Sequence, residues 1–418
     1  MKSFELFFFI ICIFVFPKYS FYFVPDFFCI YILLKYSKQV VFHNDLLKYI
    51  FAAIFLLATI TFLGQIYYGV GKSFWAYHLL RIPIYYFAAI TLLRVSQANK
   101  ETLLKYMLVV LLVSLSGSWI ELYFPEYFPK FFYDLKVESF LDAGGLKQVA
   151  YDFDSSYRSS GFYTNFQEVG FVSVIGFLIS LYCLVDRKNG NLMFLLSLLV
   201  FMESIFGIIA SGTRSAFIGV VISMIVFYVM SFLVFKNKKK FVYMTVFALL
   251  MSIILFFIIS VLLEDEGLKS RLILLSGALL LLQGEAPSSL AKSFDQIIFP
   301  NDVWVMLFGN GIQPWTTFGV PSDVGYIQLL WGMGIPGLIV FLLFYYLCIT
   351  KNLVVLKRTQ DFFYVIPFAL FIYVVIYGIK GNYFIGIHGG GDIVAFFIAI
   401  VMGYKMISRQ QFFRKPTK

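Results

Sequence analysis

Long apolar runs, separated by shorter polar ones, fill most of the chain. A helix needs about 20 mostly apolar residues to cross a bilayer. Runs of this kind lie near residues 4–19, 20–36, 49–68, 74–94, 103–123, 161–184, 191–211, 214–235, 241–263, 324–349, 362–379 and 384–404. The pattern predicts an all-α polytopic membrane protein, a single integral-membrane domain over residues 1–418, with about 12 transmembrane helices. Pro17 and Pro25 interrupt the first two runs, so roughly 11 to 13 spans fit the pattern.

The composition supports a lipid environment. Hydrophobic residues make up 61% of the chain and charged residues 13%, whereas a soluble domain has about 45–50% and about 25%. The four cysteines lie far apart in apolar runs, without a Cys-x-x-Cys or Cys/His cluster. This spacing predicts no metal site and no cofactor.

The positive charges follow an alternating pattern. The net charge is +10, which in a soluble protein is typical of nucleic-acid binding. Here, 21 of the 33 Lys and Arg residues lie in the termini and in every second connection between runs. Short loops rich in Lys and Arg stay in the cytoplasm. We therefore expect both termini to be cytoplasmic, and we expect the lipid bilayer, not a nucleic acid, as the partner.

The opposite face carries the two long connections, residues 124–160 and 264–323. Long loops in a compact protein are usually functional or disordered, and the aromatic and apolar content of these two favours order. Within the second, residues 268–282 are apolar but too short to cross the membrane. Residues 289–299 have the apolar spacing of an amphipathic helix on the outer surface.

Several short motifs follow one another on this outer face. The segment 211–217 reads Ser-Gly-Thr-Arg-Ser-Ala-Phe and joins two apolar runs. The guanidinium of Arg214 is suited to phosphate oxygens, although an arginine at a helix end also simply snorkels to the interface. Four further motifs lie around it in the chain: Tyr157-Arg158-Ser159-Ser160-Gly161-Phe162 with Asn165 and Gln167 after it, Ser270-Arg271-Leu272, Phe308-Gly309-Asn310-Gly311, and Ser322-Asp323-Val324-Gly325-Tyr326 leading into Gly332-Met333-Gly334-Ile335-Pro336-Gly337.

In this order, the motifs resemble those of the Wzy-type polymerases in the O-antigen polymerase/ligase superfamily, over about residues 150–345. The resemblance implies a GT-C-like bundle in the bacterial inner (cytoplasmic) membrane. It also implies an inverting glycosyltransferase that moves a growing glycan from undecaprenyl diphosphate to the non-reducing end of a lipid-linked repeat unit at the periplasmic face. The expected partners are the undecaprenyl-diphosphate-linked oligosaccharide and, as a candidate, a chain-length-regulating membrane protein.

Three other functions remain open: a ligase, a flippase, and a sensory or scaffolding membrane protein, which would not need the outer arginines. The related ligases transfer finished glycan to lipid A-core and usually carry a His followed by Asn before the last matched span. This chain has Ser322-Asp323 there. A flippase for the same lipid-linked unit is the alternative from another class. Transporters often show internal repeats, and we find none in the sequence.

The resemblance assigns the outer arginines to the diphosphate, because a leaving diphosphate needs compensating positive charge. The candidates for this substrate-binding role are Arg158, Arg214, Arg271, Lys380 and Asn165. The candidates for acid–base catalysis are Asp323, Glu168 and His388.

Each of these residues also has a structural interpretation. Ser322 or Asp323 could cap a helix, and Lys380 to Asp392 could be a flexible turn in which Asp392 caps the next helix. Charges inside the membrane are costly. For Arg81 and Glu203 we therefore favour helix–helix ion pairing, for example Arg81 with one of the glutamates.

Overall fold

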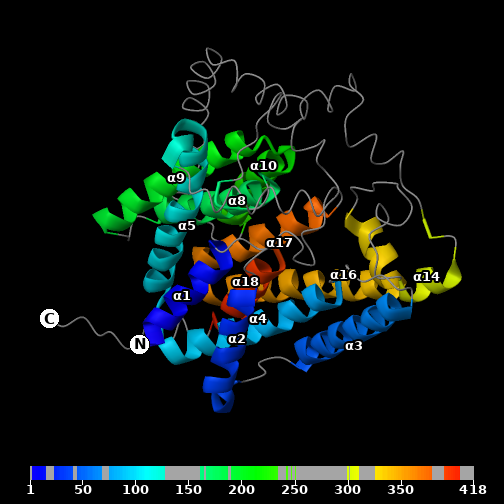
Figure 1. The fold of residues 1–418 in the computed structure, drawn as a ribbon. Coiled ribbons are helices and arrows are strands. Elements are labelled where there is room, and N and C mark those ends of the chain that lie inside the picture. Colours follow the sequence, from blue (N-terminus) through cyan, green and yellow to red (C-terminus); the bar gives the residue numbers. More distant parts are fainter. Residues whose placement is uncertain are drawn as a thin grey trace, which may run out of the picture.

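The structure, a computed structural model, describes residues 2–15, 23–40, 45–67, 75–127, 161–163, 166–186, 190–233, 299–300, 302–309, 325–378 and 390–404, with single positions at 242, 246 and 250. These residues contain twelve α-helices and no strand (Figure 1). The helices are α1 (Lys2–Phe14), α2 (Phe23–Lys35), α3 (Asp45–Tyr67), α4 (Trp75–Ser96), α5 (Lys100–Tyr123), α8 (Phe166–Val185), α9 (Asn191–Ser211), α10 (Arg214–Leu233), α14 (Val303–Phe308), α16 (Gly325–Thr359), α17 (Val365–Tyr377) and α18 (Gly390–Met402).

Six of these helices are long and apolar enough to cross a membrane, namely α4, α5, α8, α9, α10 and α16. The chain is therefore a polytopic helical protein, as its pattern predicts. Shorter apolar helices occur at Leu47–Ile60, Phe362–Tyr377 and Gly391–Met402. The full count of about twelve crossings stays a prediction. Most of the expected run 241–263 and most of the two long outer connections lie outside the described residues.

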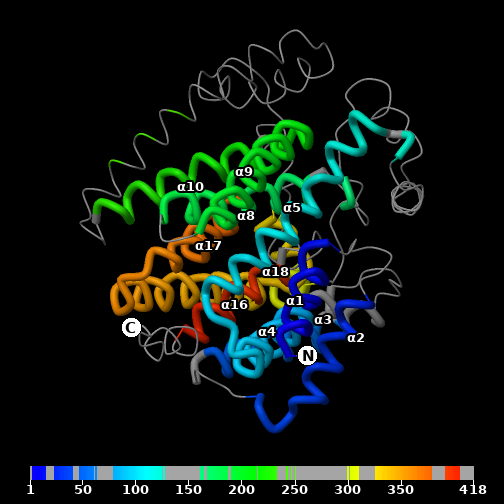
Figure 2. Tube along the Cα trace, turned by 90° about the vertical axis from the view of Figure 1, so that its left-hand side faces the viewer, coloured from blue at the N-terminus to red at the C-terminus, as the bar shows by residue number. Residues whose placement is uncertain are grey.

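The helices form two packed groups. In one, α8 packs on α9 and α10, and α5 packs on α8 and α9; in the other, α4 packs on α1, α2, α3 and α18. Helices α16 and α17 lie between the groups (Figures 1 and 2): α17 contacts α8 and α10 of the first group and α18 of the second, and α16 packs on α17 and on α3 and α18 of the second group. The centre of the molecule is α8: 94% of its Gln167–Val185 window is buried, against 39–67% for the other five candidate spans.

Small residues let α8 and α9 approach closely. A Cβ built on Gly176 would overlap the hydroxyl of Ser204, and one built on Gly207 would overlap the hydroxyl of Ser173. In lipid there is little hydrophobic drive between helices, so close packing of small residues is a main source of helix association. Spacings of three and four residues place Ser204, Gly207 and Ser211 on one face of α9.

The helices alternate in direction, so their ends form two groups. At one end, which we call the basic end, contacts join Lys35 with Glu5, Arg94 with the Gln39 carbonyl, Lys100 with Asp361 and Ser3 with Tyr106. At the opposite end, which we call the turn end, contacts join Arg81 with Asp26 and Asp392, Glu121 with Gly161, Tyr163 with the Phe14 carbonyl and Tyr326 with the Gly378 carbonyl. The first described turn of α1 and the last of α18 both belong to the basic end, where Gly403 lies beside Ile90. A cytoplasmic position for this end stays a prediction from the positive charges.

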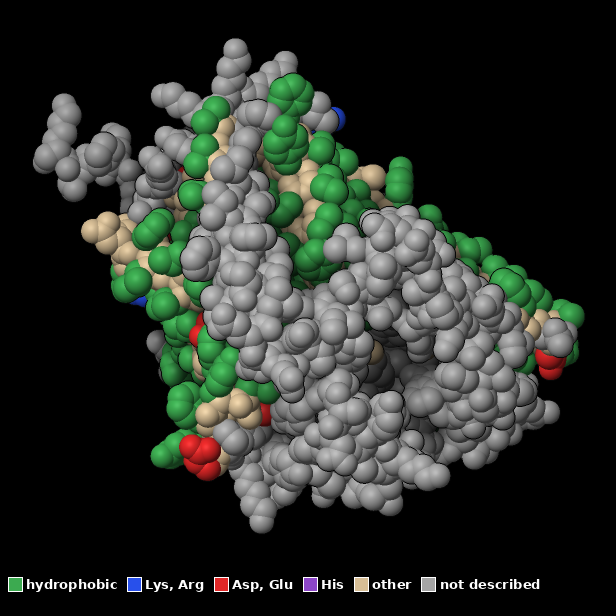
Figure 3. Space-filling model, turned by 90° about the horizontal axis from the view of Figure 1, so that it is seen from above, with side chains coloured by type: hydrophobic (Ala, Val, Ile, Leu, Met, Phe, Trp, Pro, Cys, Tyr) green, Lys and Arg blue, Asp and Glu red, His purple; other side chains and the backbone are tan. Residues whose placement is uncertain are grey.

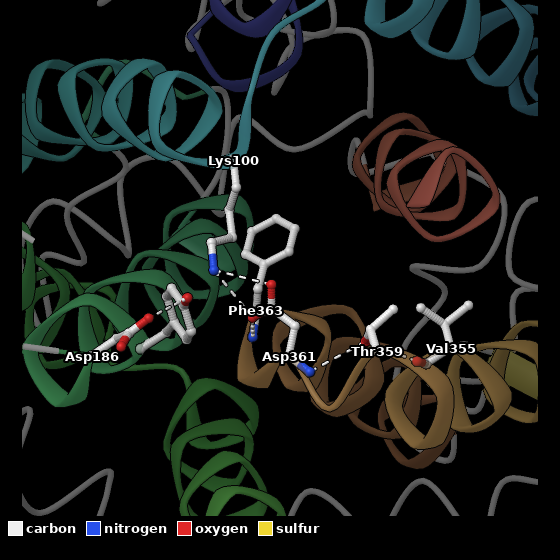
Figure 4. Close-up of polar contacts among 7 residues, drawn as sticks. Lys100, Asp186, Val355, Thr359, Asp361 and Phe363 are labelled. Carbon is white, nitrogen blue, oxygen red and sulfur yellow. Dashed lines mark hydrogen bonds and ion pairs between the residues drawn. The ribbon is translucent and has the colours of Figure 1, made fainter. Parts of the chain in front are cut away.

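A polar network ties three elements together at the basic end: α5, α8 and the 3-10 helix Phe362–Tyr364 (Figure 4). Lys100 at the start of α5 pairs with Asp361, with 3.0 Å between Nζ and Oδ2. The Asp361 carboxylate also accepts a hydrogen bond from the Phe363 N–H at 3.0 Å, which caps the short 3-10 helix Phe362–Tyr364. Next to it, Tyr182 near the end of α8 donates to Asp186 at 2.8 Å and stacks on Phe362. Both charged partners of the Lys100 pair are partly exposed, which limits the stability they contribute.

The described surface is largely apolar, as expected for a chain surrounded by lipid. Large exposed hydrophobic side chains occur along α3, α9, α10 and α16. In the view of Figure 3, the described side chains are mostly hydrophobic, and the few acidic ones are isolated from one another. Polar groups are instead collected at the two ends and in the interior.

Arg81 forms the predicted helix–helix ion pair, but its partners are aspartates. Its side chain is 3% exposed; Nη2 lies 2.8 Å from Asp392 Oδ2, and Nε lies 3.1 Å from Asp26 Oδ1. Tyr85 donates to Asp26 at 2.8 Å and accepts from Arg81 at 3.0 Å. The expected glutamate partner was therefore wrong. The residues that meet Arg81 come from α2 and α18, which flank α4 and are distant in sequence.

Replacing Arg81 with Met should destabilise the protein strongly. Two carboxylates would lose their buried cation, and removing one partner of a buried ion pair costs about 3–5 kcal/mol. The measurement is thermal unfolding of the purified protein in detergent. Arg94→Met is the matched control, because Arg94 is exposed and makes a single hydrogen bond of 3.2 Å to the Gln39 carbonyl. Equal losses in both variants would contradict this account.

Candidate functional site

The turn between α9 and α10 is fixed by its own backbone and hydroxyl groups. Gly212 adopts a left-handed conformation with φ of 57° and ψ of 22°, which glycine reaches without a steric penalty. The Ser211 hydroxyl lies 2.8 Å from that of Thr213 and donates to the Ile208 carbonyl at 2.9 Å. Helix α10 then begins at Arg214, whose backbone the structure describes but whose side chain it does not. The predicted phosphate-binding arginine thus starts a long helix directly after a rigid turn.

This turn packs against the first turns of α8. A Cβ built on Gly170 would overlap the Thr213 hydroxyl and lie 3.0 Å from the Cβ of Ala216 and 3.3 Å from the Ser211 hydroxyl. A larger residue at position 170 would therefore push the turn away. Glu168, two residues earlier on α8, is 2% exposed. The candidate acid–base residue consequently lies inside the protein, in the same turn of α8 as Gly170, which packs on the Ser211–Arg214 turn.

The described end of the first matched motif, residues 161–163, precedes α8 and contacts α5 and α1. The N–H of Gly161 donates to Glu121 Oε2 on α5 at 2.6 Å. The ring of Phe162 covers Gly117, where a built Cβ would be 2.7 Å from Phe162 Cδ2. Tyr163 donates to the carbonyl of Phe14, the last residue of α1, at 2.7 Å. This segment leads directly into α8, so α8 links the first motif to the Ser211–Arg214 turn.

The two glycine motifs of the second half also meet. Gly309 follows α14 with φ of 70°, and a Cβ there would overlap the backbone of Gly332 and Met333. Gly334, with φ of 67°, interrupts α16, and a Cβ there would lie 2.6 Å from the Leu307 carbonyl. The backbone at the end of α14 therefore packs directly against the backbone of α16 at its break. The predicted span at 324–349 is in fact a longer helix, Gly325–Thr359, with this break inside it.

The structure describes few of the predicted site residues. Six of them lie outside the described residues: Arg158, Asn165, Arg271, Asp323, Lys380 and His388. Glu168 and the backbone of Arg214 are described and lie on adjoining elements. Asp392, which could have capped a helix, lies in the first turn of α18 and binds Arg81. Among the residues that the structure describes, no group of three or more His, Cys, Asp or Glu side chains could hold a metal ion.

Sequence reasoning missed Glu121, which holds the first motif in place. Its signal is visible in hindsight: it is the one acidic residue in the outer half of the apolar run 103–123, near the end that faces the long outer connection. A charge at a span end is usually explained by snorkelling to the interface. Only the fold shows that its carboxylate receives a backbone N–H from residue 161.

Comparison with known proteins does not assign the chain to a family. No protein-family model matches the chain. No curated protein matches it either. The resemblance to the O-antigen polymerase/ligase superfamily therefore remains one of ordered motifs.

Gly309→Ala should destabilise the packing of α14 against α16. Gly309 has φ of 70° and ψ of 170°, a conformation that costs a residue with a side chain roughly 1–3 kcal/mol, and the methyl group would also meet the backbone of Gly332 and Met333. Thermal unfolding of the purified protein measures the loss. The matched control is Gly190→Ala, since a Cβ built on Gly190 has no atom within 4 Å. A Gly309→Ala protein as stable as the control would refute the backbone contact.

Proposed function

We propose that the chain is a Wzy-type polymerase of the bacterial inner membrane. In this proposal it transfers a growing glycan from undecaprenyl diphosphate to the non-reducing end of a lipid-linked repeat unit, at the periplasmic face. A chain-length-regulating membrane protein is a candidate partner. The reaction forms one glycosidic bond with inversion and releases the donor's lipid diphosphate, so the donor itself supplies the driving force.

One observation carries the proposal. The segment Gly161–Tyr163 and the Ser211–Arg214 turn belong to two of the matched motifs, and both lie at the turn end: the segment shortly precedes α8 and contacts α5 and α1, and the turn packs on Gly170 of α8. They are about 50 residues apart in sequence and come to the same end because α8 and α9 pack against each other as an antiparallel pair. A shared site for both arginine-bearing motifs is what a diphosphate-handling enzyme needs, because several cations must act on one leaving group.

The described geometry suggests how the residues divide the work. Arg214 begins α10, so its guanidinium and the N-terminal N–H groups of that helix would act on the same anion, a combination suited to phosphate. Burial of Glu168 favours a supporting role over direct contact with the acceptor. Asp323 and His388 then remain the proposed bases that take the proton from the acceptor hydroxyl. Arg158 and Arg271 would complete the diphosphate site, and Lys380 and Asn165 would contact the substrate.

Deleting the gene in its native bacterium tests the function. A polymerase deletion should remove the ladder of surface glycan on a gel and leave a single repeat unit attached to the core. The single unit stays attached because its ligation to the core does not need the polymerase. Bare core lipid would instead point to a ligase or a flippase, and an unchanged ladder would remove the proposal.

Complementation with arginine variants tests the site. Arg214→Ala and Arg271→Ala should each lower ladder formation roughly 100-fold or more, the scale of losing one preorganised charge at a transition state. Arg214→Lys should recover part of the activity, because lysine keeps the charge and loses the bidentate geometry. Arg94→Ala, at the basic end, is the matched control and should complement fully. Full ladders from both alanine variants would rule out this mechanism.

A further inference from the structure

Glu203 is an acidic residue deep inside the candidate membrane span formed by α9. At 1.5 Å per residue, it lies about 12 Å from Ser211 and about 18 Å from Asn191 along the helix axis. Among the residues that the structure describes, no lysine or arginine pairs with its carboxyl group. The ion pair that the sequence suggested for Glu203 is therefore not formed there, although an ionisable group at this depth is costly without a partner.

The carboxyl group of Glu203 is only half provided for by its own chain. The indole N–H of Trp119, on α5, lies next to it, and the Trp119 ring stacks on Phe206 with 3.7 Å between the ring centroids. The oxygen Oε2 is covered and has no hydrogen-bond partner in the described part of the chain. Because the residue is partly exposed, the carboxyl group can gain a second partner by turning outward, away from the bundle.

The outer surface beside Glu203 has the spacing of a helix-packing face. Apolar residues that are exposed or partly exposed recur on α9 at intervals of four, three and four, at Leu195, Leu199, Met202 and Phe206. Such intervals place side chains on one side of a helix, where a second helix can interlock with them. Trp119 and Tyr123 of α5, which both lie against Phe206, extend the same face. Lipid tails can cover an apolar face, but they offer no hydrogen bond to a carboxyl group.

We propose that this face binds a second copy of the chain, with the two Glu203 carboxyl groups paired across a twofold axis along the membrane normal. Both copies have the same orientation in the membrane, so a twofold axis brings equal residues together at equal depth. A protonated carboxyl group carries one donor and an acceptor, so two of them satisfy each other through reciprocal O–H···O hydrogen bonds. A helix of another protein would need a donor of its own at the same depth, whereas a second copy has the matching group automatically.

The dimer places the two candidate sites on the same side of the membrane. Each Ser211–Arg214 turn lies at the turn end, about 12 Å along α9 from the carboxyl pair. The pairing itself rests on the position and surroundings of Glu203 and does not depend on the proposed function.

Cross-linking in native membranes tests whether two copies meet at this face. The four native cysteines are buried, so Met202→Cys adds one thiol on the exposed side of α9, next to Glu203. A short membrane-permeant bis-maleimide should join two Met202→Cys chains into a band of twice the chain mass of 48.2 kDa. The unsubstituted protein and Leu343→Cys, a matched control on the exposed side of α16, should stay at the mass of one chain.

Substitutions of Glu203 in the Met202→Cys protein then test the carboxyl pair. Glu203→Leu should raise the dissociation constant of the dimer about tenfold, the value of roughly two hydrogen bonds between membrane helices. The constant is measured from the cross-linked fraction as the purified protein is diluted in lipid vesicles. Glu203→Gln should keep the dimer near its original strength, because an amide also donates and accepts. Equal elution profiles in detergent establish that the compared proteins are folded.

Three outcomes would overturn the inference. A Met202→Cys cross-link to a protein of another mass would show that a different partner binds the face. No cross-link at all would show that lipid covers it. A Glu203→Gln dimer as weak as the Glu203→Leu dimer would show that the two copies are not joined through paired hydrogen bonds at this position.

Discussion

The close contact between α8 and α9 determines most of the architecture around the candidate site. Lipid does not drive two apolar helices together, so their association depends on how near the backbones can come. Here Gly170, Gly176 and Gly207 remove the side chains that would keep α8 and the elements next to it apart. Hydroxyl groups of Ser173, Ser204 and Thr213 fill the resulting space. Helix α8 is almost wholly buried. Its contacts position the neighbouring elements at the turn end.

Contacts with α8 and with the segment before it hold the neighbouring elements at the turn end. The start of α8 places the Ser211–Arg214 turn through Gly170, and the segment before α8 is fastened to α5 and α1. The Arg81 cluster fixes α2, α4 and α18 at the same end by charge instead of by size. The turn end thus combines two kinds of constraint, close packing in one helix group and buried ion pairing in the other.

The sequence predicted the elements far better than the contacts. Apolar runs longer than a bilayer are strong local signals, so α4, α5, α8, α9 and α10 were expected close to where they lie. An ion pair for Arg81 was expected on energetic grounds, since a lone charge is costly in lipid. Its partners could not be predicted, because the choice between Asp26, Asp392 and the glutamates depends on which helices pack around α4. Glu121 was missed for the same reason, as its partner is a backbone N–H that has no sequence signature.

The contact between the end of α14 and the break in α16 limits which substitutions both segments can accept. A Cβ on Gly309 would overlap the backbone of Gly332 and Met333, and a Cβ on Gly334 would overlap the backbone of Met306 and Leu307, so neither glycine position has room for a side chain. A substitution in one motif can be tolerated only after the other motif has shifted, so the two should change together or not at all. Distant relatives of this chain, however far their apolar helices have drifted, should therefore keep both glycine motifs as a pair or lose both.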